Sequence, residues 1–148
     1  MNPRISRISN LLVVAGLCLL TIGFAQASDL SHLSGSYKVV RTTDLGSQTR
    51  IRLQLHLANH GERDLRIQRL TLWGASHPRK SATEACSLVV RTGASASTTQ
   101  EFVMPSSEYR LWRRGKDVRM LVAVESPSGR KTIEELVRLD RISGGKEN

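Results

Sequence analysis

The sequence has little cysteine, few aromatic residues and almost no helical periodicity. Only 2 of its 148 residues are cysteines, and aromatic residues make up 4%. Cys18 lies in an apolar leader, so removal of that leader leaves Cys86 alone and no intramolecular disulfide can form. This lack of cysteine pairs excludes a small toxin or inhibitor held together by disulfides.

Long apolar runs are absent as well. The run from Leu11 to Phe24 spans 14 residues, whereas a membrane-spanning helix needs about 20. Arg4 and Arg7 precede it and Ala25-Gln26-Ala27 follows, which is the order of charged region, apolar region and small-residue cleavage site in secretory signal peptides. We predict a cleaved signal peptide over residues 1–27 and an exported protein, either periplasmic or secreted.

Removing 27 of the 148 residues leaves 121, which is enough for one domain and too few for two. We assign residues 28–143 to this domain and residues 144–148 to a disordered tail. Acidic residues are scarce, because 22 Lys and Arg accompany 13 Asp and Glu for a net charge of +9, which the loss of Arg4 and Arg7 lowers to +7. The mature protein is therefore basic, and no transmembrane segment is expected in it.

Alternation of apolar and polar residues dominates the mature chain. From Arg50 to Leu57 four aliphatic residues alternate with four polar ones, which predicts a strand with one face on a core and one in water. A turn over Asn59 to Glu62 leads into a second strand, whose apolar residues change parity between Ile67 and Leu70. This change predicts a bulge near Gln68-Arg69 or a switch of the buried face.

Further strands are expected where the same alternation recurs between turn-rich segments. They cover residues 35–42, 87–91, 98–104, 108–113, 117–125 and 131–141. Seven or eight short strands without a crossover helix predict an all-β fold, a single antiparallel immunoglobulin-like β-sandwich, with a small barrel as the alternative. Residues 76–85 fit no strand pattern and are expected to form a loop or a single helical turn.

One stretch resembles a known family. The alternation that ends in Asn59-His60-Gly61, followed by Asp64-Leu65 and a second aliphatic strand, is similar to the B and C strands of bacterial immunoglobulin-like domains of exported proteins. The resemblance covers residues 50–74. It implies a sandwich fold and a role in binding, presentation or spacing, and it carries over no catalytic residues. The Cys/Trp/Cys framework of antibody domains is missing.

No group of residues predicts catalysis or a cofactor. The segment Gly93 to Ser97 lacks the final glycine of a nucleophile elbow, and Glu134 and Glu135, as neighbours on a strand, point to opposite faces. His56 and His60 are weak candidates for a metal site, because one lies on a strand and the other in the following turn without a known ligand spacing. We therefore expect a protein that is not an enzyme and holds no cofactor.

The basic residues are the one compositional feature that bears on partners. The candidate binding face comprises Arg50, Arg52, Arg110, Trp112, Arg113, Arg114 and Lys116. Arginine beside tryptophan suits an anionic sugar, a lipid headgroup or an acidic protein patch, and Trp73 is a candidate aromatic anchor. The simpler interpretation is a solvated surface that discourages strand pairing.

These observations predict an exported, non-catalytic β-sandwich module that binds another protein in the cell envelope or an envelope assembly. One alternative is a basic surface protein that binds an anionic glycan or lipid, for which binding should weaken steeply with salt. Another is a periplasmic metal-binding protein, for which at least three ligating side chains must converge. Nucleic acid is not an expected partner of an exported protein.

Overall fold

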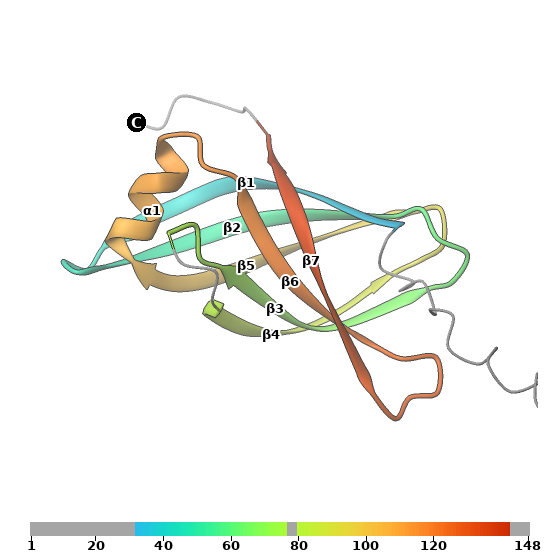
Figure 1. Ribbon diagram of the computed structural model, residues 1–148. Helices are drawn as coiled ribbons and strands as arrows, with labels where there is room; N and C mark the ends of the chain where they lie inside the picture. The colour runs from blue at the N-terminus through green and yellow to red at the C-terminus, as the bar shows by residue number, and fades with distance from the viewer. Residues whose placement is uncertain (1–31, 77–79, 143–148) are drawn as a thin grey trace, which may run out of the picture.

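The computed structural model describes residues 32–76 and 80–142 and consists of seven strands and one helix (Figure 1). The elements are β1 (Leu33–Asp44), β2 (Gln48–Asn59), β3 (Leu65–Trp73), β4 (Lys80–Val90), β5 (Ser95–Pro105), α1 (Ser106–Arg113), β6 (Val118–Glu125) and β7 (Thr132–Arg141). The predicted signal peptide over residues 1–27 and the predicted tail over residues 144–148 lie outside the described residues. No helix in the described part of the chain is long and apolar enough to cross a membrane.

All seven strands belong to one sheet, in the order β4-β3-β6-β7-β1-β2-β5. Every neighbouring pair is antiparallel except β1 and β7, which are parallel over Gly35–Tyr37 and Leu139–Arg141. The two end strands, β4 and β5, lie beside each other, with Cys86 of β4 near Thr98 of β5. The sheet is therefore a nearly closed, barrel-like mixed sheet. The all-β class is confirmed, and the prediction of a two-sheet antiparallel sandwich of the immunoglobulin-like type is wrong.

The reason for the difference lies in β1, which joins what would otherwise be two separate sheets. β1 pairs with β2 on one side and with β7 on the other. Gly35 leaves room for core side chains at this junction, because a Cβ atom there would lie 2.5 Å from Cδ2 of Leu139 and 3.0 Å from Cδ2 of Leu57. A larger residue would displace these two leucine side chains.

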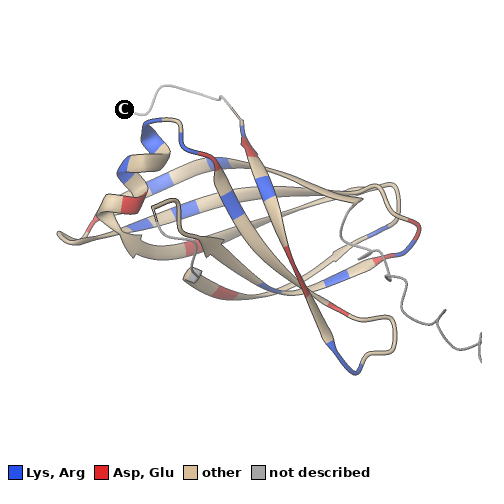
Figure 2. Cartoon of the chain, viewed as in Figure 1, with Lys and Arg blue, Asp and Glu red and all other residues tan. Residues whose placement is uncertain are grey.

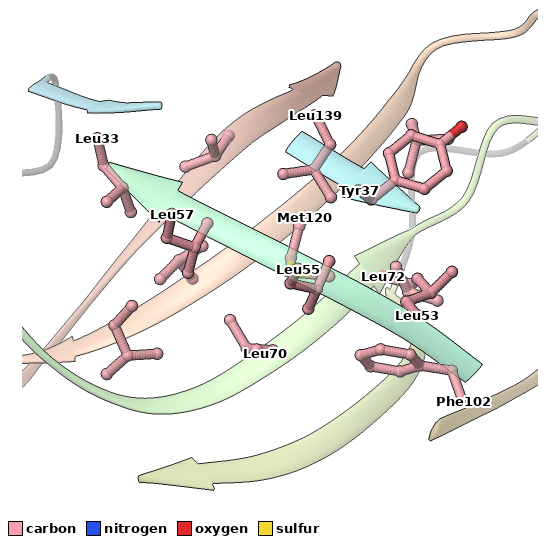
Figure 3. Close-up of a cluster of buried hydrophobic side chains, with 14 of the residues drawn as sticks. Leu33, Tyr37, Leu53, Leu55, Leu57, Leu70, Leu72, Phe102, Met120 and Leu139 are labelled. Carbon is pink, nitrogen blue, oxygen red and sulfur yellow. The ribbon is translucent and has the colours of Figure 1, made fainter. Parts of the chain in front are cut away.

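The core fills the interior of this curved sheet. Ile51, Leu53, Leu55 and Leu57 on β2 are fully buried, as the alternation in the sequence predicts. They pack with side chains from β3, β5 and β6, among which Leu70, Leu72, Phe102 and Met120 are drawn in Figure 3. Burial of each such side chain stabilises the fold by about 1.5–3 kcal/mol, so β2 is the central strand in energetic terms as well as in packing.

The predicted irregularity in β3 is confirmed as a bulge. The registers of β3 with β4 and with β6 both shift between Ile67 and Arg69. Against β6 the extra residue is Gln68 of β3, and against β4 it lies on β4 between Leu88 and Ala85. Ile67 and Leu70 therefore both point into the core although their parity differs.

Two local predictions are wrong. Residues 108–113 form most of helix α1 and not a strand. The buried residues of this segment, Glu108 and Trp112, are four apart, which is the spacing of one helix face. Residues 80–85 belong to β4 and not to a loop; β4 lacks aliphatic alternation there because Thr83, Glu84 and Ala85 are exposed. Residues 77–79 of the predicted loop lie outside the described residues.

Candidate functional site

The two halves of the barrel differ in charge. We call the half that carries α1, the turn between β1 and β2 and the end of β3 the helix half, and the half that carries the turns from β2 to β3, from β4 to β5 and from β6 to β7 the turn half (Figure 1). Eleven described basic side chains of the helix half accompany five acidic ones, a net charge of +6; the basic ones are Lys38, Arg41, Arg50, Arg52, Arg110, Arg113, Arg114, Lys116, Arg119, Arg138 and Arg141. The turn half has six of each sign and is neutral. Figure 2 shows the basic residues on α1 and on the adjoining parts of β1, β2, β6 and β7.

Two pairs of arginines face each other directly across strands in the helix half. Arg41 of β1 is the register partner of Arg52 on β2, and Arg119 of β6 is the partner of Arg138 on β7. Like charges in directly opposite positions destabilise a sheet. Their presence in two places means that the helix half carries a repulsion that the fold itself does not require.

Acidic residues neutralise only one member of each pair. Glu101 lies 3.1 Å from Arg52 and 3.4 Å from Arg50, and Asp117 lies 3.1 Å from Arg138. Arg41 and Arg119 make no ion pair with any described residue. Each is therefore free to bind an external anion without first breaking a salt bridge.

Helix α1 presents the second group of predicted site residues. Arg110, Arg113 and Arg114 are exposed on it or directly after it. Trp112, predicted to share their face, is instead 3% exposed and contacts the rings of Tyr37 and Tyr109 edge-on, with centroids 6.0 and 6.5 Å away. The helical period separates the arginines from the tryptophan, so Trp112 is a core residue.

The end of α1 positions Lys116. The amide of Gly115 donates to the carbonyl of Trp112, and the amide of Lys116 donates to the carbonyl of Leu111, which is the hydrogen-bond pattern of a Schellman motif. Gly115 has a φ of 84°, a conformation that glycine adopts without steric cost. The chain reverses here and directs Lys116 and Asp117 toward the end of β3.

A cleft of about 410 Å³ lies at this junction. It is lined by Trp73, Gly74, Ala75, Gly115, Lys116, Asp117 and Arg119. Trp73 and Arg119 are register partners on β3 and β6, and so their side chains leave the sheet on the same face. The structure therefore brings the predicted anchor Trp73 together with one predicted cation, Lys116, and one cation that the sequence did not indicate, Arg119.

Glu108 fixes the wall of this cleft opposite the sheet. Its side chain, 7% exposed, accepts hydrogen bonds from the amides of Ala75 at 2.7 Å and Ser76 at 3.2 Å, and from the Ser76 hydroxyl. Hydrogen bonds to a charged acceptor are about twice as strong as neutral ones. Helix α1 is thereby tied to the segment that follows β3.

The structure does not bring His56, His60 and Cys86 together into a metal site. The side chain of His56 makes a 2.6 Å hydrogen bond with Ser97, and that of His60 makes a 2.9 Å hydrogen bond with Ser34. No three His, Cys, Asp or Glu side chains converge among the described residues. Cys86 is partly buried between β4 and β5, and this burial raises the pKa of its thiol, while the hydrogen bond with Thr98 lowers it.

A second cleft, of about 420 Å³, lies in the turn half beside the turn between β6 and β7. Arg63, Arg66, Asp64 and Glu125 line it together, so its charges balance. It lacks both an aromatic side chain and an excess of one charge, and it indicates no ligand class.

Comparison with known proteins assigns no family. No family of known sequence pattern matches the chain, and no curated protein matches it. Three solved structures are similar in part. A protein from Archaeoglobus fulgidus is 18% identical, with 72% of this chain and 89% of that chain covered and a TM-score of 0.39. A glycosyl hydrolase family 2 member from Bacteroides cellulosilyticus is 9% identical, with 72% and 14% covered and a TM-score of 0.41. The structural genomics target SoR45 is 12% identical, with 80% and 97% covered and a TM-score of 0.41. TM-scores of this size are too low to carry a fold or an activity over to this chain.

Two residues of the candidate site, Arg119 and Glu108, were not among the sequence-based predictions. Arg119 becomes part of the cleft only through the register of β3 with β6, for which no local signal exists. Glu108 had a local signal, because it precedes Trp112 by one helical turn and the segment lies between Pro105 and Gly115, residues that favour a helix start and a helix end.

Proposed function

We propose that this protein is an exported, non-catalytic binding module whose helix half binds an anionic glycan. The observation that carries the proposal is the unequal distribution of charge, +6 in one half and zero in the other. The cross-strand arginine pairs also support the proposal, since local features that destabilise a fold often mark a functional site. Surfaces of one charge raise the local concentration of oppositely charged ligands and speed their association.

A glycan accounts for the helix half better than a lipid surface does. The cations lie on α1, on the loop after it and on the outer faces of several strands, and so they surround one half of the barrel instead of forming one plane. Trp73 lines a cleft, whereas a tryptophan that anchors a protein in a membrane interface has to project from the surface. A flexible polyanion can follow such a curved surface.

The test compares two triple variants of the chain from Ser28 to Asn148. One is Arg110→Gln, Arg113→Gln, Arg114→Gln in the helix half, and the control is Arg66→Gln, Arg91→Gln, Arg130→Gln in the turn half; all six arginines are exposed. Binding to immobilised polygalacturonate is measured over a series of salt concentrations. We expect the helix-half variant to bind roughly tenfold more weakly, at about 0.5 kcal/mol per exposed cation, and the control to bind nearly as the wild type does.

Three outcomes would contradict the proposal. The first is that the wild type binds no polygalacturonate at low salt. The second is that both triple variants lose affinity equally, because binding would then respond to net charge alone. The third is tighter binding to vesicles that contain anionic phospholipid than to polygalacturonate, which would make a lipid headgroup the partner.

A protein partner is a second candidate function, favoured by the outer edge of β1. β1 pairs with β7 only as far as Tyr37, whose carbonyl also accepts from the amide of Ile142. Beyond Tyr37, none of the described strands pairs with this edge, where an extended segment of another protein could add as a strand. We place this candidate second because the edge has a register shift between Val39 and Arg41 and carries the basic residues Lys38 and Arg41. Bulges and basic residues are features that keep an edge strand unpaired.

The edge hypothesis has its own measurement. If a protein adds a strand there, amide hydrogen exchange of Lys38–Asp44 slows in envelope extract and returns to its free rate once proteins in the extract are digested. Unchanged exchange in both extracts would eliminate strand addition at this edge.

A further inference from the structure

Trp73 differs from the other tryptophan of the protein in its place in the fold. The protein has two tryptophans, and Trp112 belongs to the core. Trp73 is neither a member of the core cluster nor one of the partly buried residues packed against it. Leu72 and Met120, which flank the Trp73–Arg119 pair on their two strands, are fully buried and close the core beneath it. The fold therefore does not need the indole of Trp73 for core packing.

The polar residues around Trp73 favour an anion. Arg119 has no acidic partner among the described residues, and Lys116 makes only a backbone hydrogen bond. The one carboxylate of the cleft, on Asp117, is engaged with Arg138. A guanidinium binds a carboxylate through two parallel hydrogen bonds, and an ammonium adds a point charge beside it.

The remaining lining residues are small. Gly74, Ala75 and Gly115 add little side-chain bulk to the cleft, while Glu108 holds Ala75 in place. The volume of about 410 Å³ falls within the range of roughly 300–1,000 Å³ found for small-ligand sites. A single sugar ring can therefore lie with one face against Trp73 and its charged substituent directed at Arg119.

We propose that the cleft of Trp73, Lys116 and Arg119 is a subsite for one uronic acid residue of the anionic glycan. The apolar face of the sugar ring packs on the indole, the carboxylate pairs with Arg119, and Lys116 stabilises the same negative charge. This inference rests on the proposed function and adds to it a recognition step that depends on shape as well as on charge.

The test uses tri-galacturonate, its methyl ester and the variants Trp73→Ala and Arg119→Lys, with Arg66→Gln in the turn half as a control. Affinity is measured by calorimetry, and thermal unfolding verifies that each variant is folded. We expect Trp73→Ala to bind tri-galacturonate at least tenfold more weakly. Arg119→Lys, which keeps the charge, should lose affinity several-fold because the lysine cannot bind bidentately, and Arg66→Gln should change it less than twofold. The methyl ester should bind far more weakly than the acid to the wild type.

Fluorescence gives an independent readout. Because Trp112 is buried in the core, ligand-dependent emission should come from Trp73, and the variant Trp73→Phe should abolish it. If the wild type binds polygalacturonate while Trp73→Ala and Arg119→Lys bind tri-galacturonate as the wild type does, this inference is wrong and the proposed function stands. If the wild type does not bind polygalacturonate at all, the proposed function itself has failed.

Discussion

The two halves of the barrel are built from the same seven strands but differ in how their polar and charged side chains are paired. In the turn half, polar groups are matched. Asn59, 1% exposed, donates to the carbonyls of Arg63 at 2.6 Å and Val90 at 3.1 Å and accepts from the amide of Gly61 at 2.9 Å. Arg69 also reaches over Ala123, which separates them in the register, to pair with Glu134 at 2.6 Å.

The helix half contains the opposite features. Arg41 and Arg52 face each other, Arg119 has no acidic partner among the described residues, and Trp73 lies outside the core. The comparison indicates that the matched polar groups of the turn half stabilise the fold, whereas the exposed, charged surface of the helix half lowers its stability. Substitutions in each half should therefore separate stability from binding.

Replacing Asn59 should cost the most stability and the least binding. Asn59→Ala leaves the carbonyls of Arg63 and Val90 and the amide of Gly61 without their partner, and each buried unsatisfied group costs about 1–3 kcal/mol. We expect the free energy of unfolding in urea to fall by roughly 2–4 kcal/mol, with polygalacturonate affinity unchanged in the folded protein. Loss of affinity in the folded variant would show that the halves are not independent.

Removing one arginine of a facing pair should have the opposite effects. Arg41→Thr relieves the repulsion with Arg52 and introduces a residue that favours strands, so the free energy of unfolding should rise by about 0.2–1 kcal/mol at low salt. Affinity for polygalacturonate should fall about twofold to fivefold, as for one exposed cation. Arg66→Thr in the turn half is the matched control. A less stable Arg41→Thr variant would mean that the arginine contributes packing that outweighs the repulsion.

The smallest effect concerns pH and the ring cluster under α1. Burial raises the pKa of the Tyr37 phenol above its usual 10.0; Arg141 lowers it, and Tyr109 raises it. Because the folded state holds this proton more tightly than the unfolded state, the stabilisation is complete below pH 10 and is lost as pH rises through the folded pKa.

For one such group the dependence is at most about 1.4 kcal/mol per pH unit. Urea titrations between pH 9 and 11 should therefore show a shallower loss of stability for Tyr37→Phe than for the wild type. Parallel curves for the two proteins would show that Tyr37 does not titrate differently on folding.

The strands were predictable because their burial follows the sequence pattern. In β2 the aliphatic residues from Ile51 to Leu57 all point into the core, and the change of parity in β3 located its bulge. Closure of the sheet was not predictable, since alternation tells which face of a strand is buried but not which strand is its neighbour.

The candidate site was predictable in part for the same reason. Trp73 and Lys116 were recognised as residues that suit an anionic partner, but they meet only through the sheet register and the turn at Gly115. Trp112 was placed with the arginines because Arg110, Trp112 and Arg114 would share one face if this short segment were a strand. A window this short cannot separate periods of 2 and 3.6.

The parallel contact between β1 and β7 also bears on how the protein folds. Gly35 and Leu139 come from opposite ends of the domain, so the pairing that joins the two sides of the sheet is among the least local in the chain. Contacts of this kind slow folding, because a long loop must be closed before they form. A chain synthesised from its N-terminus cannot complete this sheet until the last strand is available, and until then β1 has only β2 as a partner.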